Sequence, residues 1–199
     1  MNSFARVSAL LLSALLTAIA ADAPAKPPVV DKFLNLFEEL RTSGSVRQSG
    51  QSPRVSFQLT ESEIDDYMRY SLKTAPRPGL DSVTVKIFPN NYISTYSVID
   101  FDAVERWKPG TIPGILRPVL SGKKSIWVDY RFHVQGAKAT FSVEKAYYQN
   151  VRLPAFVVEK TIEIVAAKQP EKYDTSKPVT LPFGLSQLST VDHTVMGQN

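Results

Sequence analysis

Three side chains with acid–base chemistry alternate within residues 125–135, namely Asp129, Arg131 and His133. In an extended strand this spacing places them on one face, and the expected hairpin register puts Glu144 opposite Asp129. Two facing carboxylates could transfer a proton to a substrate or hold a cation. Because one pair of strands supplies no pocket, the pattern favours a solvated face on which Arg131 neutralises both acids. We therefore predict no catalytic residue here.

The histidines of the chain, His133 and His193, give no further support for catalysis. Neither stands in an HxxxH, HxH or HExxH context, and a catalytic zinc site usually needs three protein ligands. The sequence contains no cysteine, no GxSxG motif and no Gly-rich phosphate loop. We predict a protein that is not an enzyme and that has neither a metal nor a cofactor. The least favoured alternative is a hydrolase with a serine nucleophile and one of these histidines as the base.

A second group of candidates is apolar and could line a cavity between a sheet and a helix. Burial of hydrocarbon is enough to drive a lipid or another hydrophobic molecule into such a space. A filled core predicts the same periodicity, so that alternative stays open. The candidate ligand-binding residues are Tyr130, Phe132, Phe141, Val143, Val158, Ile162 and Val165.

The segment from Arg106 to Lys124 combines basic and apolar residues and contains no acidic residue. Positive charge beside apolar anchors is typical of a surface that meets an anionic membrane. The alternative is a crossover between strands whose apolar residues pack on the core. The candidate membrane-contact residues are Arg106, Trp107, Lys108, Arg117, Lys123 and Lys124. The net charge of +4 is too small to indicate a polyanionic partner, so we expect no nucleic acid to bind.

Residues 1–20 have the form of a secretory signal. Arg6 is followed by an apolar run from Val7 to Ile19, and Ala18-Ile19-Ala20 matches the small-x-small pattern of a cleavage site. The run is shorter than the ~20 residues of a membrane-spanning helix, so cleavage is favoured over an uncleaved anchor. We predict an exported protein, periplasmic or extracellular, that folds without disulfides because it has no cysteine.

Hydrophobic periodicity divides the rest of the chain into helices and strands. Residues 21–53 are expected to form the helix Val29–Arg41 and the flexible linker Ser43–Pro53, and residues 54–199 to form one domain. The capping box that begins at Thr60 marks a second helix, which ends near Lys73. Extended segments are expected at Arg54–Leu59, Ser82–Phe88, Tyr92–Val104, Ser125–Gln135 and Lys138–Tyr148, and at Val179–Val195 with a kink around Pro182 and Gly184.

The clearest expected pairing is a hairpin that turns at Gly136-Ala137. Its register sets Phe132 opposite Phe141 and Tyr130 opposite Val143, so that the apolar faces of the two strands agree. Short connections between these and the neighbouring strands indicate antiparallel pairing.

The helix expected after this hairpin, Ala155–Lys168, is apolar on most sides and must therefore be covered. The predicted fold class is α+β, with a long curved antiparallel sheet wrapped around this C-terminal apolar helix. A cystatin-like sheet that clasps one helix is the alternative.

Three short motifs follow one another in an order that resembles a known group of proteins. Leu59-Thr60-Glu61-Ser62-Glu63-Ile64 marks a helix start, Val151-Arg152-Leu153-Pro154 leads into the apolar helix, and Leu181-Pro182-Phe183-Gly184-Leu185 opens the last strand. From Arg54 to Val195 this order resembles the YpmS- and LmeA-type bacterial envelope proteins, and more distantly the tubular lipid-binding (TULIP) modules. The resemblance implies a rolled sheet around a helix, an apolar groove for acyl chains and no invariant catalytic residue.

Together these observations favour an exported, non-enzymatic module that binds a lipid or another hydrophobic ligand in the bacterial envelope. The alternative is a structural or assembly protein of the envelope that acts through protein–protein contacts. In that case a partner would dock at a sheet edge or on the apolar stripe of Val29–Arg41.

Overall fold

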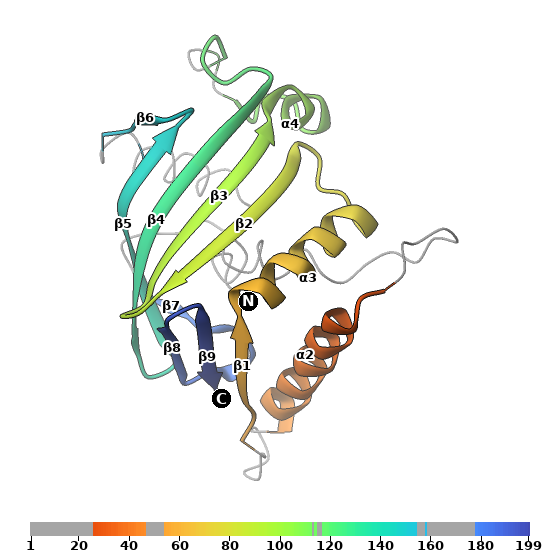
Figure 1. Cartoon of the computed structure of the whole chain (residues 1–199), viewed down its shortest axis with the longest axis vertical. Helices are drawn as coiled ribbons and strands as arrows, with labels where there is room; N and C mark the ends of the chain where they lie inside the picture. Colours follow the sequence, from red (N-terminus) through yellow and green to blue (C-terminus); the bar gives the residue numbers. More distant parts are fainter. Residues whose placement is uncertain (1–25, 47–53, 113, 115–116, 155–157, 159–177) are drawn as a thin grey trace.

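The computed structural model describes residues 26–46, 54–112, 114, 117–154, 158 and 178–199. In these residues the strands form two antiparallel sheets, a large one in the order β2-β3-β4-β5-β6, with β7 also paired to β5, and a small one in the order β1-β9-β8 (Figure 1). The predicted α+β class and antiparallel pairing are confirmed. The elements are α2 (Pro28–Val46), β1 (Ser56–Thr60), α3 (Glu61–Thr74), β2 (Leu80–Phe88), β3 (Tyr92–Asp100), α4 (Phe101–Trp107), β4 (Lys123–Gln135), β5 (Lys138–Tyr148), β6 (Val151–Arg152), β7 (Val179–Thr180), the 3-10 turn η3 (Pro182–Gly184), β8 (Gln187–Val191) and β9 (Thr194–Gln198).

The long hairpin of β4 and β5 dominates the large sheet. Near its turn the register is the predicted one, because Phe132 pairs with Phe141 and Tyr130 pairs with Val143. Gly136 has a φ of 59°, a left-handed conformation that glycine adopts without steric cost. The alternation of apolar residues therefore sets this part of the sheet correctly.

A β-bulge in β5 changes the register beyond Tyr130. Asp129 pairs with Lys145, because Glu144 is the additional residue of the bulge. The prediction that Glu144 lies opposite Asp129 is therefore wrong. On the outer face, past the bulge, Tyr147 pairs with Trp127, and their ring centroids are 5.9 Å apart.

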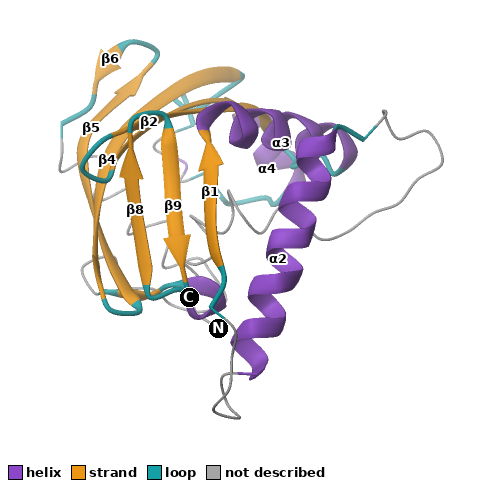
Figure 2. Cartoon of the chain, turned by 60° about the horizontal axis from the view of Figure 1, so that its bottom comes forward, coloured by secondary structure: helices purple, strands orange, loops and turns teal. Residues whose placement is uncertain are grey.

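Two helices cover the core on the side of the small sheet. The predicted capping box begins α3: the Glu63 amide donates to the Thr60 hydroxyl at 3.2 Å, and the Thr60 amide donates to the Glu63 carboxylate at 2.8 Å. α3 packs against β2, and α2 packs against α3 and η3 (Figure 2). Val30, Phe33 and Leu40 of α2 are buried in the core. The apolar stripe predicted for this helix is thus covered by the protein itself.

The last described strands form a hairpin, where the sequence predicted one extended segment over Val179–Val195. The expected kink is present as η3, but the chain turns again at His193, whose φ is 54°. Because β8 and β9 pair with each other and β9 pairs with β1, this hairpin completes the small sheet.

Side-chain hydrogen bonds tie the small sheet to its neighbours. The Thr190 hydroxyl donates to the Phe88 carbonyl at 2.6 Å, and the Thr190 amide donates to the Asn91 side chain at 2.9 Å. The buried Asn199 accepts from the Val55 amide at 2.9 Å. The contacts of Thr190 fix the small sheet against the β2–β3 turn, and the contact of Asn199 joins the start of β1 to the end of β9 within the small sheet.

Other boundaries differ from the predicted ones. β3 ends at Asp100 and not at Val104, because the Asp100 side chain accepts from the Ala103 amide at 3.0 Å and caps α4. α2 continues to Val46, so the start of the expected linker is helical. Three predictions fall outside the described residues: the signal at 1–20, the rest of the linker, and the apolar helix Ala155–Lys168 apart from Val158. The helices that the structure shows lie in the N-terminal and middle parts of the chain.

Candidate cavity for a hydrophobic ligand

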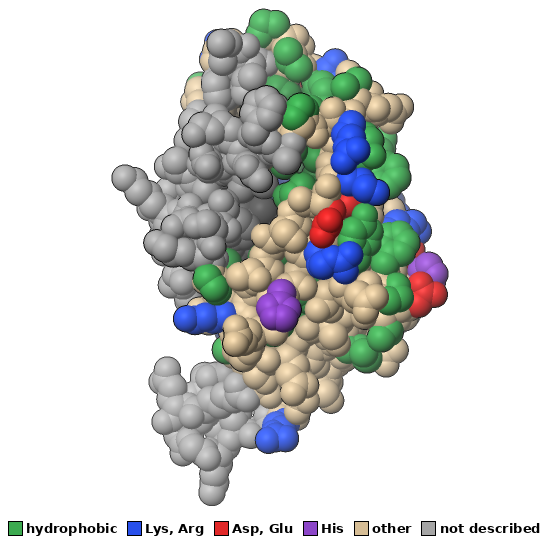
Figure 3. Space-filling model, turned by 90° about the vertical axis from the view of Figure 1, so that its left-hand side faces the viewer, with side chains coloured by type: hydrophobic (Ala, Val, Ile, Leu, Met, Phe, Trp, Pro, Cys, Tyr) green, Lys and Arg blue, Asp and Glu red, His purple; other side chains and the backbone are tan. Residues whose placement is uncertain are grey.

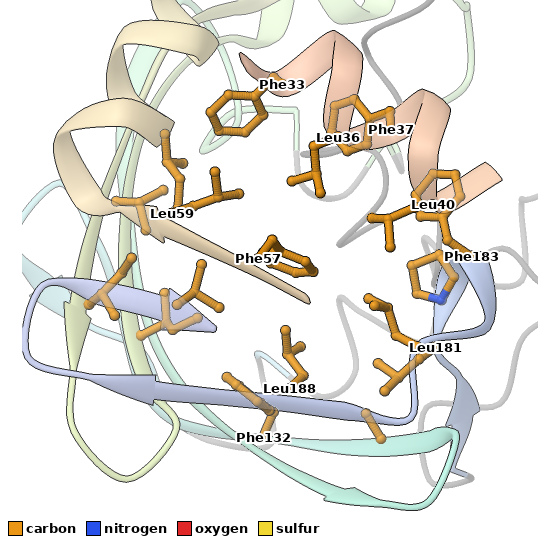
Figure 4. Close-up of a pocket in the computed structure, with 18 of the residues that line it drawn as sticks. Phe33, Leu36, Phe37, Leu40, Phe57, Leu59, Phe132, Leu181, Phe183 and Leu188 are labelled. Carbon is orange, nitrogen blue, oxygen red and sulfur yellow. The ribbon is translucent and has the colours of Figure 1, made fainter. Parts of the chain in front are cut away.

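A cavity of about 200 Å³ lies between the two sheets and the helices α2 and α3. Figure 4 shows Phe57 near the middle of this space, with Phe33 and Leu36 of α2 on one side and Phe132 and Leu188 on the other. The described lining residues are Phe33, Leu36, Phe37, Leu40, Phe57, Leu59, Ile64, Tyr67, Met68, Val85, Ile87, Ile93, Tyr130, Phe132, Ala139, Phe141, Val179, Thr180, Leu181, Pro182, Phe183, Leu185, Leu188 and Val195. Segments from both ends of the described chain therefore build a single space.

The wall of this cavity is almost entirely hydrocarbon. Among the lining side chains that the structure describes, only Tyr67, Tyr130 and Thr180 carry an oxygen. Burial raises the pKa of the Tyr67 hydroxyl and raises that of Tyr130 to about 12, so both phenols are neutral at pH 7. Tyr67 also stacks on Phe33 with ring centroids 4.2 Å apart. The wall is uncharged and suits an apolar ligand, because a charged group would lose its hydration here.

The size of the cavity limits what it can hold. An apolar cavity of about 150 Å³ is known to accept benzene. By proportion, about 200 Å³ accommodates roughly eight carbon atoms. That is below the ~300–1,000 Å³ of a pocket for a drug-sized ligand. The geometry fits a small hydrophobic molecule or the end of an acyl chain, and not a whole lipid.

The structure brings together some of the residues proposed from the sequence. Tyr130, Phe132 and Phe141 line the cavity. Val143 pairs with Tyr130 but is not among the described lining residues. Val158 is buried, also apart from the lining. Ile162 and Val165 lie outside the described residues.

Most of the wall was missed because it comes from elements that the sequence did not place against the hairpin. Phe33, Leu36 and Leu40 line it from α2, and Leu188 and Val195 line it from β8 and β9. The available signal is the apolar stripe of α2, which in the sequence alone is equally compatible with a docking face for a partner. A stripe shows that a helix face is covered, but not by what.

The polar face of the hairpin contains no pair of facing carboxylates. Asp129 is 6% exposed and accepts from the Trp127 indole N–H at 2.7 Å. Burial, followed by the Asp129 carboxylate, raises the pKa of Tyr92 to about 12. Arg131 pairs with Glu144 at 3.3 Å. Each acid thus has its own partner on this face, and Asp129 holds the Trp127 ring in place.

The histidines lie away from the cavity lining. His133 is exposed on β4. His193, in the β8–β9 turn, lies 3.2 Å from the Glu61 carboxylate and 3.6 Å from Asp192. In the part of the chain that the structure describes, no group of three or more His, Cys, Asp or Glu side chains could hold a metal ion.

The basic segment is partly neutralised by ion pairs. Arg117 pairs with Glu105 at 2.6 Å, and Lys123 pairs with Asp81 at 2.6 Å. Lys124 is half-buried at the start of β4. The three candidate membrane-contact residues at the end of α4 and just after it are exposed, namely Arg106, Trp107 and Lys108.

No protein-family model and no curated protein sequence matches the chain. Across the described residues, no helix is both long enough and apolar enough to cross a bilayer.

Proposed function

We propose that the protein binds a small hydrophobic molecule, or the end of an acyl chain, in the cavity between its two sheets. It would do so as an exported, non-enzymatic module of the bacterial envelope, in line with the signal-like residues 1–20. The observation that supports this proposal is the uncharged hydrocarbon wall around about 200 Å³ of space. The resemblance to YpmS- and LmeA-type proteins points in the same direction. In a fold of that kind, the expected apolar helix Ala155–Lys168 would pack against the curved sheet and add to the cavity wall.

The cavity volume sets the affinity to expect. Burying about eight methylene groups contributes ~6.4 kcal/mol at ~0.8 kcal/mol each. This corresponds to a dissociation constant of about 20 µM before the entropic costs of binding are subtracted. Because the wall offers little hydrogen bonding, chain length should control the affinity and the polar end of the ligand should matter little.

The test is a calorimetric titration of the protein with straight-chain alcohols of increasing length. Each added methylene should strengthen binding about fourfold, since ~0.8 kcal/mol is that factor at 25 °C. The gain should stop near eight carbons, when the cavity is full. Native mass spectrometry of protein isolated from its own envelope without detergent would then identify the natural ligand. A folded protein that binds no alcohol of any length would refute the proposal.

A matched pair of variants separates ligand exclusion from loss of stability. Ala139 is completely buried and lines the cavity, whereas Ala146 is 2% exposed on the same strand but is not a lining residue. Ala139→Leu adds three carbons to the wall, so by the same proportion the gain in affinity should stop near five carbons instead of eight in a folded protein. Ala146→Leu should overpack the sheet and lower stability by ~1–3 kcal/mol while binding persists. Equal effects of the two variants on binding would contradict the cavity assignment.

A structural or assembly role is the second candidate, and one observation favours it. Tyr96, Trp127 and Tyr147 occupy consecutive register positions across β3, β4 and β5, on the face turned away from the cavity. Tyr96 and Trp127 are both more than two-fifths exposed. Exposed aromatic side chains are enriched where proteins meet. Co-purification of a protein partner that is lost in Tyr96→Ser would favour this role over ligand binding.

A further inference from the structure

We propose that the end of the large sheet that carries α4 and β6 docks on the surface of an anionic bilayer. This membrane-docking end consists of exposed residues from three separate segments. They are Arg106, Trp107, Lys108, Val119, Val151 and Arg152. The proposal concerns a different part of the molecule from the cavity and does not depend on the cavity being occupied.

Hydrogen bonds bring these segments to one end of the sheet. The Tyr148 hydroxyl donates to the Val119 carbonyl at 2.5 Å, and Tyr148 pairs in register with Val151. Glu105, near the end of α4, pairs with Arg117, which precedes Val119 by two positions. The β6 tip, the segment around Val119 and the end of α4 therefore lie at the same end of the large sheet, which is the upper end in Figure 1.

The apolar residues of this end are unusually exposed. Trp107 is 66% exposed, Val151 65% and Val119 55%. These are the largest exposed fractions of any large hydrophobic residue in the described part of the chain, and the next is Trp127 at 46%. In Figure 3, hydrophobic and basic side chains stand side by side at the upper end of the molecule. Tryptophan is favoured at the boundary between lipid headgroups and acyl chains, because its ring is both apolar and polar.

The charges of the docking end suit an anionic surface. Arg106, Lys108 and Arg152 are exposed and form no ion pair within the described residues. The acids nearby are mostly engaged, because Glu105 pairs with Arg117, Asp81 pairs with Lys123, and Asp100 caps α4. Among the described residues of this end, Asp102 in the first turn of α4 is the remaining exposed acid. Free cations beside apolar anchors attract anionic headgroups and insert only shallowly.

Docking at this end leaves the cavity away from the bilayer. Tyr130, the first residue of β4 in the cavity wall, follows Lys124 by six positions. At ~3.3 Å per residue this is about 20 Å, which exceeds the reach of a side chain from the docking end. Membrane binding and ligand binding should therefore be separable in experiments.

The emission of Trp107 tests the proposal directly, because the chain has only one other tryptophan, Trp127. Vesicles that contain phosphatidylglycerol should shift the emission of the full chain to shorter wavelength. Trp107→Phe should show no shift, since Trp127 lies on the outer face of the sheet. The probe reports on the docking end itself, so binding of residues 1–20 to the vesicles would not mimic it. No shift in the unmodified chain, or an equal shift with purely zwitterionic vesicles, would overturn the proposal.

Charge variants provide the second arm of the test. Arg106→Gln and Lys108→Gln should each weaken vesicle binding about fivefold, which is ~1 kcal/mol per basic residue, and Asp102→Asn should strengthen it. Lys138→Gln is the matched control, because Lys138 is an exposed lysine at the opposite end of the hairpin. If Lys138→Gln weakened binding as much as Lys108→Gln, net charge would explain the attraction and the docking end would be refuted.

Discussion

Replacement of Glu61 tests how the two sheets are held together. Glu61 is 9% exposed at the start of α3. Its carboxylate accepts from the Lys86 ammonium at 2.5 Å and from the Ile87 amide at 2.9 Å, and it lies 3.2 Å from His193 Nδ1. Lys86 and Ile87 belong to β2, whereas His193 is in the turn of the small sheet. Glu61 therefore links α3 to both sheets.

The substitution Glu61→Gln keeps the size of the side chain but replaces one acceptor oxygen by an NH₂ group. That group must then face a donor, so at least one charge-assisted hydrogen bond is lost. Such a bond contributes ~1.5–3 kcal/mol, and we expect the free energy of unfolding to fall by about 2 kcal/mol. With a urea dependence of ~1–3 kcal/mol per molar, the unfolding midpoint should drop by about 1 M. Glu39→Gln, at an exposed position on α2, should change stability by less than ~0.5 kcal/mol.

The pH dependence gives a stricter test of the same contacts. Burial opposes ionisation of Glu61, but the contacts with Lys86, the Ile87 amide and His193 prevail and lower its pKa below the ordinary 4.5. The stabilisation from ionised Glu61 is therefore complete above pH 4.5 and is lost as the pH falls through the lower folded-state pKa. The stability difference between the unmodified protein and Glu61→Gln should be largest at pH 7 and shrink toward pH 3. A difference that stays constant over this range would refute the electrostatic explanation.

Three other substitutions test the packing of the core and one of its buried hydrogen bonds, with urea unfolding as the measurement in each case. Phe132→Ala should cost ~3–5 kcal/mol, because Phe132 is 2% exposed; a cost below ~1 kcal/mol would show that this part of the core is loosely packed. Gly197→Ala should cost ~1–3 kcal/mol, since its Cβ would come within 2.3 Å of the Phe57 ring; a neutral result would mean that this ring has room to move. Asn199→Ala removes the acceptor of the Val55 amide and should cost ~1–3 kcal/mol, whereas Asn35→Ala, at an exposed position in α2, should be nearly neutral.

Local patterns in the sequence predicted the parts of the fold that depend on neighbouring residues. The capping box at Thr60, the hairpin turn at Gly136 and the pairing of Phe132 with Phe141 are all present. Each depends on a spacing of a few residues, or on a register counted from a tight turn. Three aromatic residues of the hairpin that its alternation singles out, Tyr130, Phe132 and Phe141, line the cavity.

The remainder depends on contacts between distant segments, for which one sequence gives no direct signal. The bulge at Glu144 leaves the sequence pattern nearly unchanged, yet it shifts the pairing of every later residue of β5. The small sheet joins β1, near the start of the described domain, to β8 and β9 at the far end of the chain. Its hairpin turns at His193, a residue type that adopts positive φ less readily than glycine and therefore gave no turn signal. The α2 side of the cavity was missed because α2 is also far in the sequence from the strands that it packs against.

Polar contacts between the two sheets bear on how the cavity remains open. An apolar interior packs to a high density, and contact between hydrocarbon walls favours closing any space between them. Here the walls belong to two sheets that are joined by Glu61, which bonds to both of them, and by Thr190, which bonds to Asn91 at the same junction. Moving the sheets closer would break these hydrogen bonds, and each buried group left unpaired would cost ~1–3 kcal/mol. The space is therefore maintained by polar groups that do not line it, so Glu61→Gln should alter the chain length at which alcohol binding stops improving, even though Glu61 touches no ligand.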